Sequence, residues 1–342
     1  MYICSMIFVT GGTGLVGSHI LLKLSLQQRD FIALKRSSSS LSVCRKIFSN
    51  YNLTHLFEKI KWIDGDINDI SILKEAMIDC QYIIHCAAIV SFHQSDLHLM
   101  KKINIEGTAN VMNVALDSDI KKCVYISSVA TLGYEKNTII DESNYFKHQN
   151  NNSNYAKTKY YAEQEVWRAA AEGLKVVIVN PSIILGPGNW NKGSSQIFKK
   201  IYDGLKFYSE GGSGYVDVVD VADAVIKLLF SNINNERFIL NSVNLSYRKC
   251  FDKIAYHLNK PRSTIKVTPL LKEISWRLEL LKSIFTGAKP LITKETAHNA
   301  MVFRKYSNKK IKEFIDFEFI PIEETIKKYS KWFIKELGDF PG

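Results

Sequence analysis

The chain has 342 residues, 46% of them hydrophobic and 23% charged, which is enough apolar sequence for one large domain or two coupled lobes. Only 7 Pro and 18 Gly are present, so collagen-like and disordered classes are excluded. The formal net charge of +11 suggests an anionic partner, and residues 248–342 carry +9 of it. No nucleic-acid-binding motif accompanies the charge, so we expect a lysine-rich surface and no nucleic-acid partner.

The cysteines and the apolar segments bear on the compartment in which the protein works. Six cysteines are scattered without a CxxC pair, a pattern typical of free thiols in a reducing compartment and of a chain without a zinc site. The N-terminus lacks the features of a secretory leader, and no segment approaches about 18 consecutive apolar residues. We therefore expect a cytoplasmic protein with no transmembrane segment and no bound metal.

Short β-branched runs alternate with helical patterns through the first half of the chain. The runs predict buried strands at 6–10, 31–34, 61–63, 82–86, 122–127 and 176–179. Helices are predicted at 18–26, 71–77, 104–115 and 155–172. This alternation predicts an α/β fold with a doubly wound parallel sheet, the Rossmann arrangement.

The second half of the chain is organised differently. Beyond residue 183 the pattern changes to turns and a helix-rich tail, which predicts a smaller C-terminal lobe. We expect a nucleotide-binding domain over 1–183 and a substrate-binding lobe over 184–342. One more strand-then-helix unit at 216–230 predicts that 215–242 returns to the main sheet.

A glycine-rich loop joins the first predicted strand to the first predicted helix. Its GxxGxxG spacing allows a tight turn, a close approach of backbone to a pyrophosphate and close packing of helix on strand. The helix N-terminus would then offer free N–H groups to the phosphates. The predicted phosphate-binding residues are Gly11, Thr13, Gly14, Leu15, Val16 and Gly17.

Lys35 and Arg36 follow the second predicted strand, where enzymes that use NAD usually carry an acid for the ribose 2′-hydroxyl. An acid would repel a 2′-phosphate, whereas Arg36 could bind it with charge-assisted hydrogen bonds. The alternative is that both are ordinary surface cations. The missing acid favours NADP(H), with NAD(H) as the other possibility.

Two further strand ends are candidates for cofactor contact. Asp66 and Ile67 follow the third predicted strand, where a carboxylate could meet the adenine amino group. Ala87 and Ala88 follow the fourth strand, where small side chains would let the backbone lie along the cofactor. Each motif taken alone is also common at strand ends.

The chain contains four Tyr-x-x-x-Lys pairs, so spacing alone does not identify a catalytic pair. Tyr155 and Lys159 alone begin a long predicted helix and follow a strand that ends near Ser128. Their spacing places both side chains on one helical face. A nearby ammonium lowers the pKa of a tyrosine from about 10. We predict that Tyr155 exchanges a proton with the substrate oxygen, that Lys159 supports Tyr155 and holds the nicotinamide ribose, and that Ser128 binds the substrate oxygen.

Several longer motifs occur in order over about 225 residues. They are TGGTGLVG at 10–17, GDI at 65–67, HCAA at 85–88, NIEGT at 104–108, SSVATLG at 127–133, YAKTK at 155–159, NPSIILGPG at 180–188 and YVDVVDVADA at 215–224. On these motifs the chain resembles the extended short-chain dehydrogenase/reductase superfamily, within its NAD-dependent epimerase/dehydratase group. It is most similar to the branch of dihydroflavonol reductases and 3β-hydroxysteroid dehydrogenases.

The resemblance implies that Ser128, Tyr155 and Lys159 are the catalytic triad, and that backbone at Pro181 and Ser182 meets the nicotinamide. It also implies a structural role for Asp220 at a turn between lobes, and a possible homodimer. The chain departs from sugar-nucleotide enzymes in two places: Asn180 stands where they often have Arg, and Leu185 where they often have Tyr.

Aromatic and small polar residues dominate the predicted substrate contacts. These candidates are Ser91, His93, Tyr134, Asn189, Trp190 and Tyr208. No Arg occurs between Arg168 and Arg237, although a nucleotide-sugar pyrophosphate usually requires such a cation. The preferred substrate is therefore a fairly apolar ketone, aldehyde or alcohol, and each aromatic residue has core packing as its alternative.

Residues 269–290 show apolar side chains at three- and four-residue spacings beside several cations. This pattern predicts a helix that closes over the substrate cleft. A helix lying in a membrane interface is the second interpretation.

Three functional hypotheses follow from the sequence. The first is an NADP-dependent reductase or dehydrogenase acting on a small-molecule carbonyl or alcohol. The second is a nucleotide-sugar epimerase or dehydratase with tightly bound NAD(P). The third is a non-catalytic NADP-sensing protein, which would have no need of the Ser128, Tyr155 and Lys159 set.

Overall fold

A seven-stranded parallel sheet forms the centre of the computed structural model, which describes residues 5–135, 137–149, 152–286 and 293–338. The strand order is β11-β7-β5-β4-β1-β2-β3, as in a doubly wound fold. The strands are β1 (Met6–Thr10), β2 (Phe31–Lys35), β3 (Lys61–Asp64), β4 (Cys80–His85), β5 (Lys122–Ile126), β7 (Val176–Pro181) and β11 (Glu236–Leu240). The predicted fold class is confirmed, and the six predicted strands are placed to within two residues.

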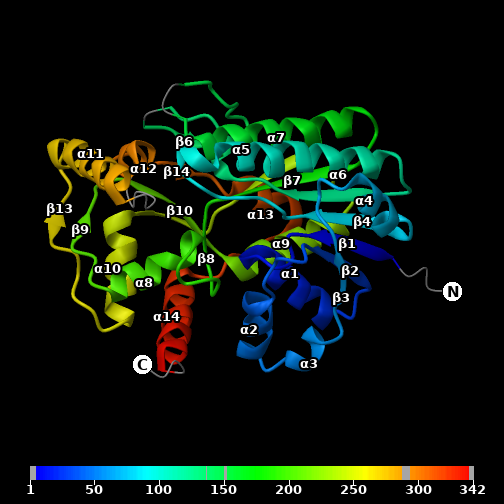
Figure 1. Ribbon diagram of the computed structural model, residues 1–342, viewed down its shortest axis with the longest axis horizontal. Coiled ribbons are helices and arrows are strands. Elements are labelled where there is room, and N and C mark those ends of the chain that lie inside the picture. The colour runs from blue at the N-terminus through cyan, green and yellow to red at the C-terminus, as the bar shows by residue number, and fades with distance from the viewer. Residues whose placement is uncertain (1–4, 136, 150–151, 287–292, 339–342) are drawn as a thin grey trace.

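Helices cover both faces of the sheet, so its strands are apolar on both sides (Figure 1). One face carries α1 (Leu15–Leu26), α2 (Ser42–Asn50), α3 (Thr54–Phe57) and α9 (Val218–Leu229). The other carries α4 (Ile70–Met77), α6 (Gly107–Leu116) and α7 (Asn154–Ala171). Each layer has its own buried core, and the fully buried β5 borders both.

The helix predicted at 104–115 begins earlier and contains an irregular turn. It runs from α5 (Leu97–Met100) through a π-helical segment, η2 (Lys101–Glu106), into α6. Asn104, on η2, is buried and pairs with the backbone of Ile89: its Oδ1 accepts from the N–H at 2.7 Å, and its Nδ2 donates to the carbonyl at 3.0 Å. Such wide turns often occur at functional sites, and this one lies against the chain that leaves β4.

The remaining elements form a second lobe and its connections. A three-stranded sheet, ordered β12-β10-β8, contains β8 (Ile183–Leu185), β10 (Gly212–Asp217) and β12 (Val243–Ser246). Around it lie α8 (Gln196–Tyr202), α10 (Tyr247–His257) and α14 (Ile322–Gly338). The smaller elements are η1 (Gln94–Asp96), η3 (Val129–Thr131), β6 (Ile139–Ile140), η4 (Gly193–Ser195), β9 (Phe207–Tyr208), β13 (Ile265–Lys266), α11 (Pro269–Thr286), α12 (Lys294–Asn299), β14 (Lys305–Tyr306) and α13 (Lys309–Ile315).

The predicted unit at 216–230 is divided between the two lobes. Its strand, β10, pairs with β8 and β12 rather than with the main sheet. Its helix, α9, does pack on the main sheet, and β11 after it becomes the edge strand beside β7. β10 does not join the main sheet because β8, which follows β7, leaves that sheet and offers β10 a parallel partner outside it.

Two buried acids join the lobes at α9. Asp217 caps α9 by accepting from the N–H of Val219, and it also accepts from Thr325 and Tyr329 of α14 at 2.7 and 2.8 Å. Asp220 accepts from the backbone N–H of Ile320 at 3.0 Å, and burial raises its pKa to about 7. Asp217 therefore attaches the C-terminal helix to α9, and Asp220 attaches the chain just before that helix; Asp220 lies in the first turn of α9 and not at a turn between the lobes.

The predicted helix at 269–290 is present as α11 over Pro269–Thr286, and residues 287–290 lie outside the described residues. Its apolar positions face away from the body: Leu270 is 71% exposed, Leu278 60% and Leu281 51%. Lys272 and Trp276 lie on the less exposed side. The expectation of an apolar face packed over a cleft is therefore wrong for these three leucines. None of the helices in the described ranges is long and apolar enough to span a membrane.

Candidate active site

The loop between β1 and α1 is held in a tight turn. Gly11 has a φ of +71°, and a Cβ there would lie 2.6 Å from the backbone nitrogen of Ala87 after β4. A Cβ on Gly17 would lie 2.2 Å from the carbonyl oxygen of Gly11. Side chains are therefore excluded at both positions. Gly14 precedes α1 without a side-chain cap, so the first-turn N–H groups are donors for an anion.

The start of α7 carries the predicted Tyr–Lys pair. Ser153 caps this helix by accepting from the N–H of Ala156 at 3.0 Å. Lys159 is only 1% exposed, and its Nζ donates to the Tyr125 hydroxyl at 2.6 Å and to the Ile126 carbonyl at 2.7 Å. Burial lowers the pKa of Lys159 to about 7. The ammonium therefore lies directly behind the end of β5.

Tyr155 and Ser128 lie together at that strand end. The sequence predicted that a nearby ammonium would lower the pKa of Tyr155, but burial raises it, and a hydrogen bond with Ser128 only partly opposes the rise. Ser128 is partly exposed, and its Oγ also accepts from the N–H of Ala130 at 3.1 Å. The ring of Phe92 contacts that of Tyr155 edge-on, with centroids 6.0 Å apart. The structure thus brings together the three residues that the sequence predicted as a catalytic set.

A buried histidine supports the floor of this site. His85 lies between Thr10 and Thr108, with its ring nitrogens 2.6 and 3.0 Å from their hydroxyls, and it stacks on Tyr125 at 5.4 Å. Burial lowers the pKa of His85 to about 3, so the ring is neutral. The uncharged ring adds no further positive charge beside Lys159.

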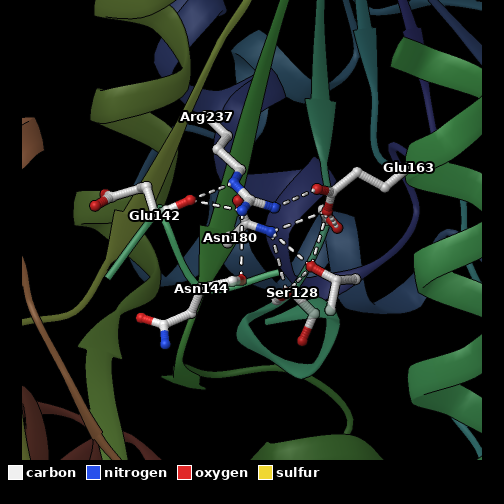
Figure 2. A network of polar contacts seen from close by, with 8 residues as sticks. Ser128, Glu142, Asn144, Glu163, Asn180 and Arg237 are labelled. Carbon is white, nitrogen blue, oxygen red and sulfur yellow. Dashed lines mark hydrogen bonds and ion pairs between the residues drawn. The ribbon is translucent and has the colours of Figure 1, made fainter. Parts of the chain in front are cut away.

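Sequence reasoning did not identify Glu163 and Arg237 as residues of the site. Glu163 and Asn180 are fully buried behind Ser128, and Arg237 from β11 forms an ion pair with Glu163 at 3.3 Å (Figure 2). A signal existed for Glu163, because it follows Lys159 by four residues and shares its helical face. Nothing in the sequence pointed to Arg237, which lies 74 positions beyond Glu163.

The ends of β2 and β3 form the opposite side of the predicted cofactor site. Lys35 forms an ion pair with Asp64, so its ammonium is not a free cation. Arg36 is exposed and lines a cavity of about 530 Å³ with Asp66 and Lys102. An exposed guanidinium at a cavity fits a phosphate group, so the residues present here fit a phosphorylated dinucleotide better through Arg36 than through Lys35.

Other predicted cofactor residues contribute mainly backbone. The side chain of Ile67 is buried against Gly107 in the core. Ser182 donates its hydroxyl to the Leu240 carbonyl at 3.2 Å, and Pro181 is buried in β7. Ala87 donates its N–H to Thr10 at 3.3 Å, and the adjacent Ala88 is exposed after β4.

The predicted substrate residues lie in three places: beside Tyr155, in the core of the second lobe, and at or near the surface. Ser91 and His93 flank Phe92 in the turn beside Tyr155, although the Ser91 hydroxyl is engaged with Asp96 at 2.7 Å. Trp190 packs between Phe198 and Phe333 in the core of the second lobe and donates to Glu336, so its indole is used for packing.

The other three candidates lie at or near the surface. Tyr134 and Tyr208 are half-buried and lie beneath the guanidinium groups of Arg304 and Arg248, at 5.2 and 4.4 Å from the ring centres. Asn189 is exposed and accepts from the N–H of Asn191. Of the six candidates, only Ser91 and His93 adjoin a ring that contacts Tyr155.

Known proteins resemble the chain in sequence and in fold. A Synechocystis protein provisionally named dihydroflavonol 4-reductase is 35% identical over 63% of this chain and 60% of that protein. Cinnamoyl-CoA reductase 1 from Petunia hybrida is 26% identical over 83% of this chain and 79% of the relative. The crystal structure of gox2253 superposes with a TM-score of 0.80 at 26% identity, covering 97% of this chain and 98% of that one.

A family model covers most of the first two-thirds of the chain. The model described as the NAD dependent epimerase/dehydratase family matches residues 7–240, from β1 to the end of β11. This range contains the glycine loop and the Ser128, Tyr155 and Lys159 set. The chain belongs to the NAD-dependent epimerase/dehydratase family.

Proposed function

We propose that this protein is an NADP-dependent oxidoreductase that interconverts an apolar ketone or aldehyde and its alcohol. The observation that carries the proposal is the grouping of Ser128, Tyr155 and the buried Lys159 at the end of β5, beside the Phe92 ring. The two relatives described above are named for the reduction of dihydroflavonol and of cinnamoyl-CoA. Their names support a carbonyl reductase over the other activities of the family.

In this proposal each residue of the set has one role. When bound, the nicotinamide supplies or accepts the hydride. Tyr155 gives a proton to the substrate oxygen in reduction and takes it back in oxidation. Ser128 donates a hydrogen bond to the same oxygen and stabilises its developing charge. Lys159 has three N–H donors, of which two bind Tyr125 and Ile126. The third is available for the ribose, and the ammonium charge favours the ionised form of Tyr155.

NADP(H) is the proposed cofactor. The N–H groups at the start of α1 would bind the pyrophosphate, and Arg36 would bind the 2′-phosphate. Asp64 lies opposite Lys35 at the end of β3 and is already paired with it, so Asp64 is not a free acceptor for a ribose hydroxyl.

An apolar substrate is supported by the side chains near Tyr155. Phe92, whose ring contacts Tyr155, is 36% exposed. Covering this exposed apolar surface with an apolar substrate would be favourable. Calorimetric titration with NADPH and NADH, followed by an absorbance screen of apolar ketones and aldehydes, tests the proposal. We expect tighter binding of NADPH and its oxidation by at least one carbonyl. Conversion of nucleotide sugars without net consumption of NADPH would overturn it.

A further inference from the structure

A buried carboxylate lies behind the catalytic set. Glu163 is 1% exposed on α7, and both of its oxygens have partners (Figure 2). Oε2 accepts from Ser127 Oγ at 2.5 Å, from Thr131 Oγ1 at 2.9 Å and from Asn180 Nδ2 at 3.0 Å. Oε1 forms the ion pair with Arg237. Burying a carboxylate is costly unless it is paired, and here four groups share that task.

Asn180 connects this carboxylate to the catalytic serine. Its Nδ2 donates to the Ser128 carbonyl at 3.1 Å as well as to Glu163. The amide cannot be turned over, because its oxygen would then face the carboxylate and the carbonyl. Ser127 and Thr131, on either side of Ser128, bind Glu163 directly. Glu163 therefore holds the Ser127–Thr131 segment directly at its two ends and, through Asn180, at the Ser128 carbonyl.

Arg237 holds the chain around Glu142, which packs next to this segment. Its Nε and Nη2 donate to the Glu142 carbonyl, the first at 2.9 Å. The chain that follows packs on Gly133, where a Cβ would lie 2.1 Å from the Tyr145 carbonyl oxygen. One guanidinium thus links Glu163 to the loop that closes over Gly133, just after the catalytic serine (Figure 2).

Glu163 is also the counter-charge of Lys159. The titratable groups that interact with Lys159 are Tyr125 of β5, His85 and Cys86 at the end of β4, and Glu163 of α7. His85 is neutral, and burial raises the pKa of Cys86 to about 12. Among these groups of the described chain, Glu163 alone has a carboxylate. Burial lowers the pKa of Lys159, and attraction to Glu163 is the largest effect in the opposite direction.

We propose that Glu163 is a positioning residue for the reaction. It supplies the negative charge that keeps the buried Lys159 ammonium protonated, and through Asn180 it fixes the segment that carries Ser128. The first role acts on the protonation of the set and the second on its geometry. This inference rests on the proposed carbonyl–alcohol chemistry, because that reaction requires the Lys159 charge beside Tyr155.

Two substitutions separate the roles. Glu163→Gln keeps the shape and an acceptor for Asn180 but removes the charge. Glu163→Asp keeps the charge but withdraws the carboxylate by one methylene, so it cannot reach Ser127 and Asn180 together. Glu165→Gln is the matched control, since Glu165 lies on the same helix and pairs with Arg168 at the surface.

Melting temperature against pH gives a readout that does not depend on activity. The pKa of Lys159 is lower in the folded protein than in the unfolded chain, so Lys159 makes stability rise as pH increases above the folded pKa of about 7. In Glu163→Gln this rise begins at a lower pH. We expect the deficit of Glu163→Gln relative to wild type to be largest near pH 5–6 and to shrink by about pH 8. Glu165→Gln should show no such trend.

The pH profile of kcat/KM gives the second readout. Activity should be lost as pH rises through the pKa of Lys159, and we expect this alkaline limb to move about one pH unit lower in Glu163→Gln. Glu163→Asp should keep the limb in place and lower kcat about tenfold. If Glu163→Gln does not fold, Glu163→Gln with Arg237→Met removes both charges, and the limb should still move to lower pH, by a smaller amount because a nearby cation is lost as well.

The two proposals fail in different ways. A pH-independent stability deficit together with an unmoved alkaline limb would overturn the role of Glu163 while leaving the reductase intact. A protein that turns over no carbonyl would overturn the proposed function, and the pH dependence of the melting temperature would still decide whether Glu163 is the counter-charge of Lys159.

Discussion

The polar residues at the end of β5 and β7 differ sharply from those at the end of β2 and β3. Lys159, Glu163 and Asn180 are at most 1% exposed, and partners on several elements fix them. Arg36 is exposed, and the Asp64 side chain is 62% exposed. A buried polar group depends on its own partners, whereas an exposed one is compensated by water. Substitutions should therefore impair chemistry at the first place and only cofactor binding at the second.

Tyr155→Phe should have the largest effect. This substitution removes only the hydroxyl group of the side chain. Loss of a positioned acid–base group lowers the rate by about 10²–10⁴-fold. We expect kcat to fall by about 10³-fold with the affinity for NADPH unchanged, measured by absorbance and by calorimetry. A rate within a few-fold of wild type would show that proton transfer uses another group.

Ser128→Ala should be the next largest. Loss of one hydrogen bond to the reacting oxygen costs about 10²-fold in kcat. Ser128 Oγ also accepts from the N–H of Ala130, so the melting temperature should be recorded in parallel. A loss of stability at unchanged kcat would assign Ser128 to the turn alone.

Arg36→Ser should act on the cofactor rather than on the reaction. Charge-assisted hydrogen bonds contribute about 1.5–3 kcal/mol, so the dissociation constant for NADPH should rise at least tenfold. The dissociation constant for NADH is the internal control and should not change. Equal weakening of both cofactors would refute a contact with the 2′-phosphate.

Lys35→Ser should have the smallest effect. Its ammonium is bound to Asp64 at the surface, and exposed ion pairs contribute about 0–1 kcal/mol. We expect the affinity for NADPH to stay within about twofold of wild type and the melting temperature to change little. A loss as large as that of Arg36→Ser would mean that Lys35 leaves Asp64 when the cofactor binds.

Local sequence predicted the main sheet because each of its strand–helix units carries its own signal. Each apolar run, the glycine loop and the Tyr155–Lys159 pair is made of residues only a few positions apart in the sequence. The partner of a strand is not encoded in this way, so the pairing of β10 with β8 and β12 was not foreseen.

The site was predictable only in part for the same reason. Tyr155 and Lys159 share a helix, but Arg237 reaches Glu163 from a strand 74 residues away. Trp190 is an aromatic residue of the kind that often contacts substrates, but it lies in the core. Phe333 of the distant helix α14 packs against it, and the local sequence does not show that contact. Periodicity identified the apolar side of α11 but not the direction in which that side points.

The π-helical turn at η2 also adds one residue to the helix that runs from α5 to α6. Met100 before it and Thr108 after it are both fully buried, and Thr108 binds His85 beneath the catalytic set. A π-helical segment holds one residue more than the α-helical segment that turns through about the same angle. Removing one residue from 101–106 would therefore restore α-helical winding while Met100 and Thr108 stay on their buried sides. Gene variants with a one-residue deletion here should keep both ends of this helix in place and lose only the wide turn that carries Asn104.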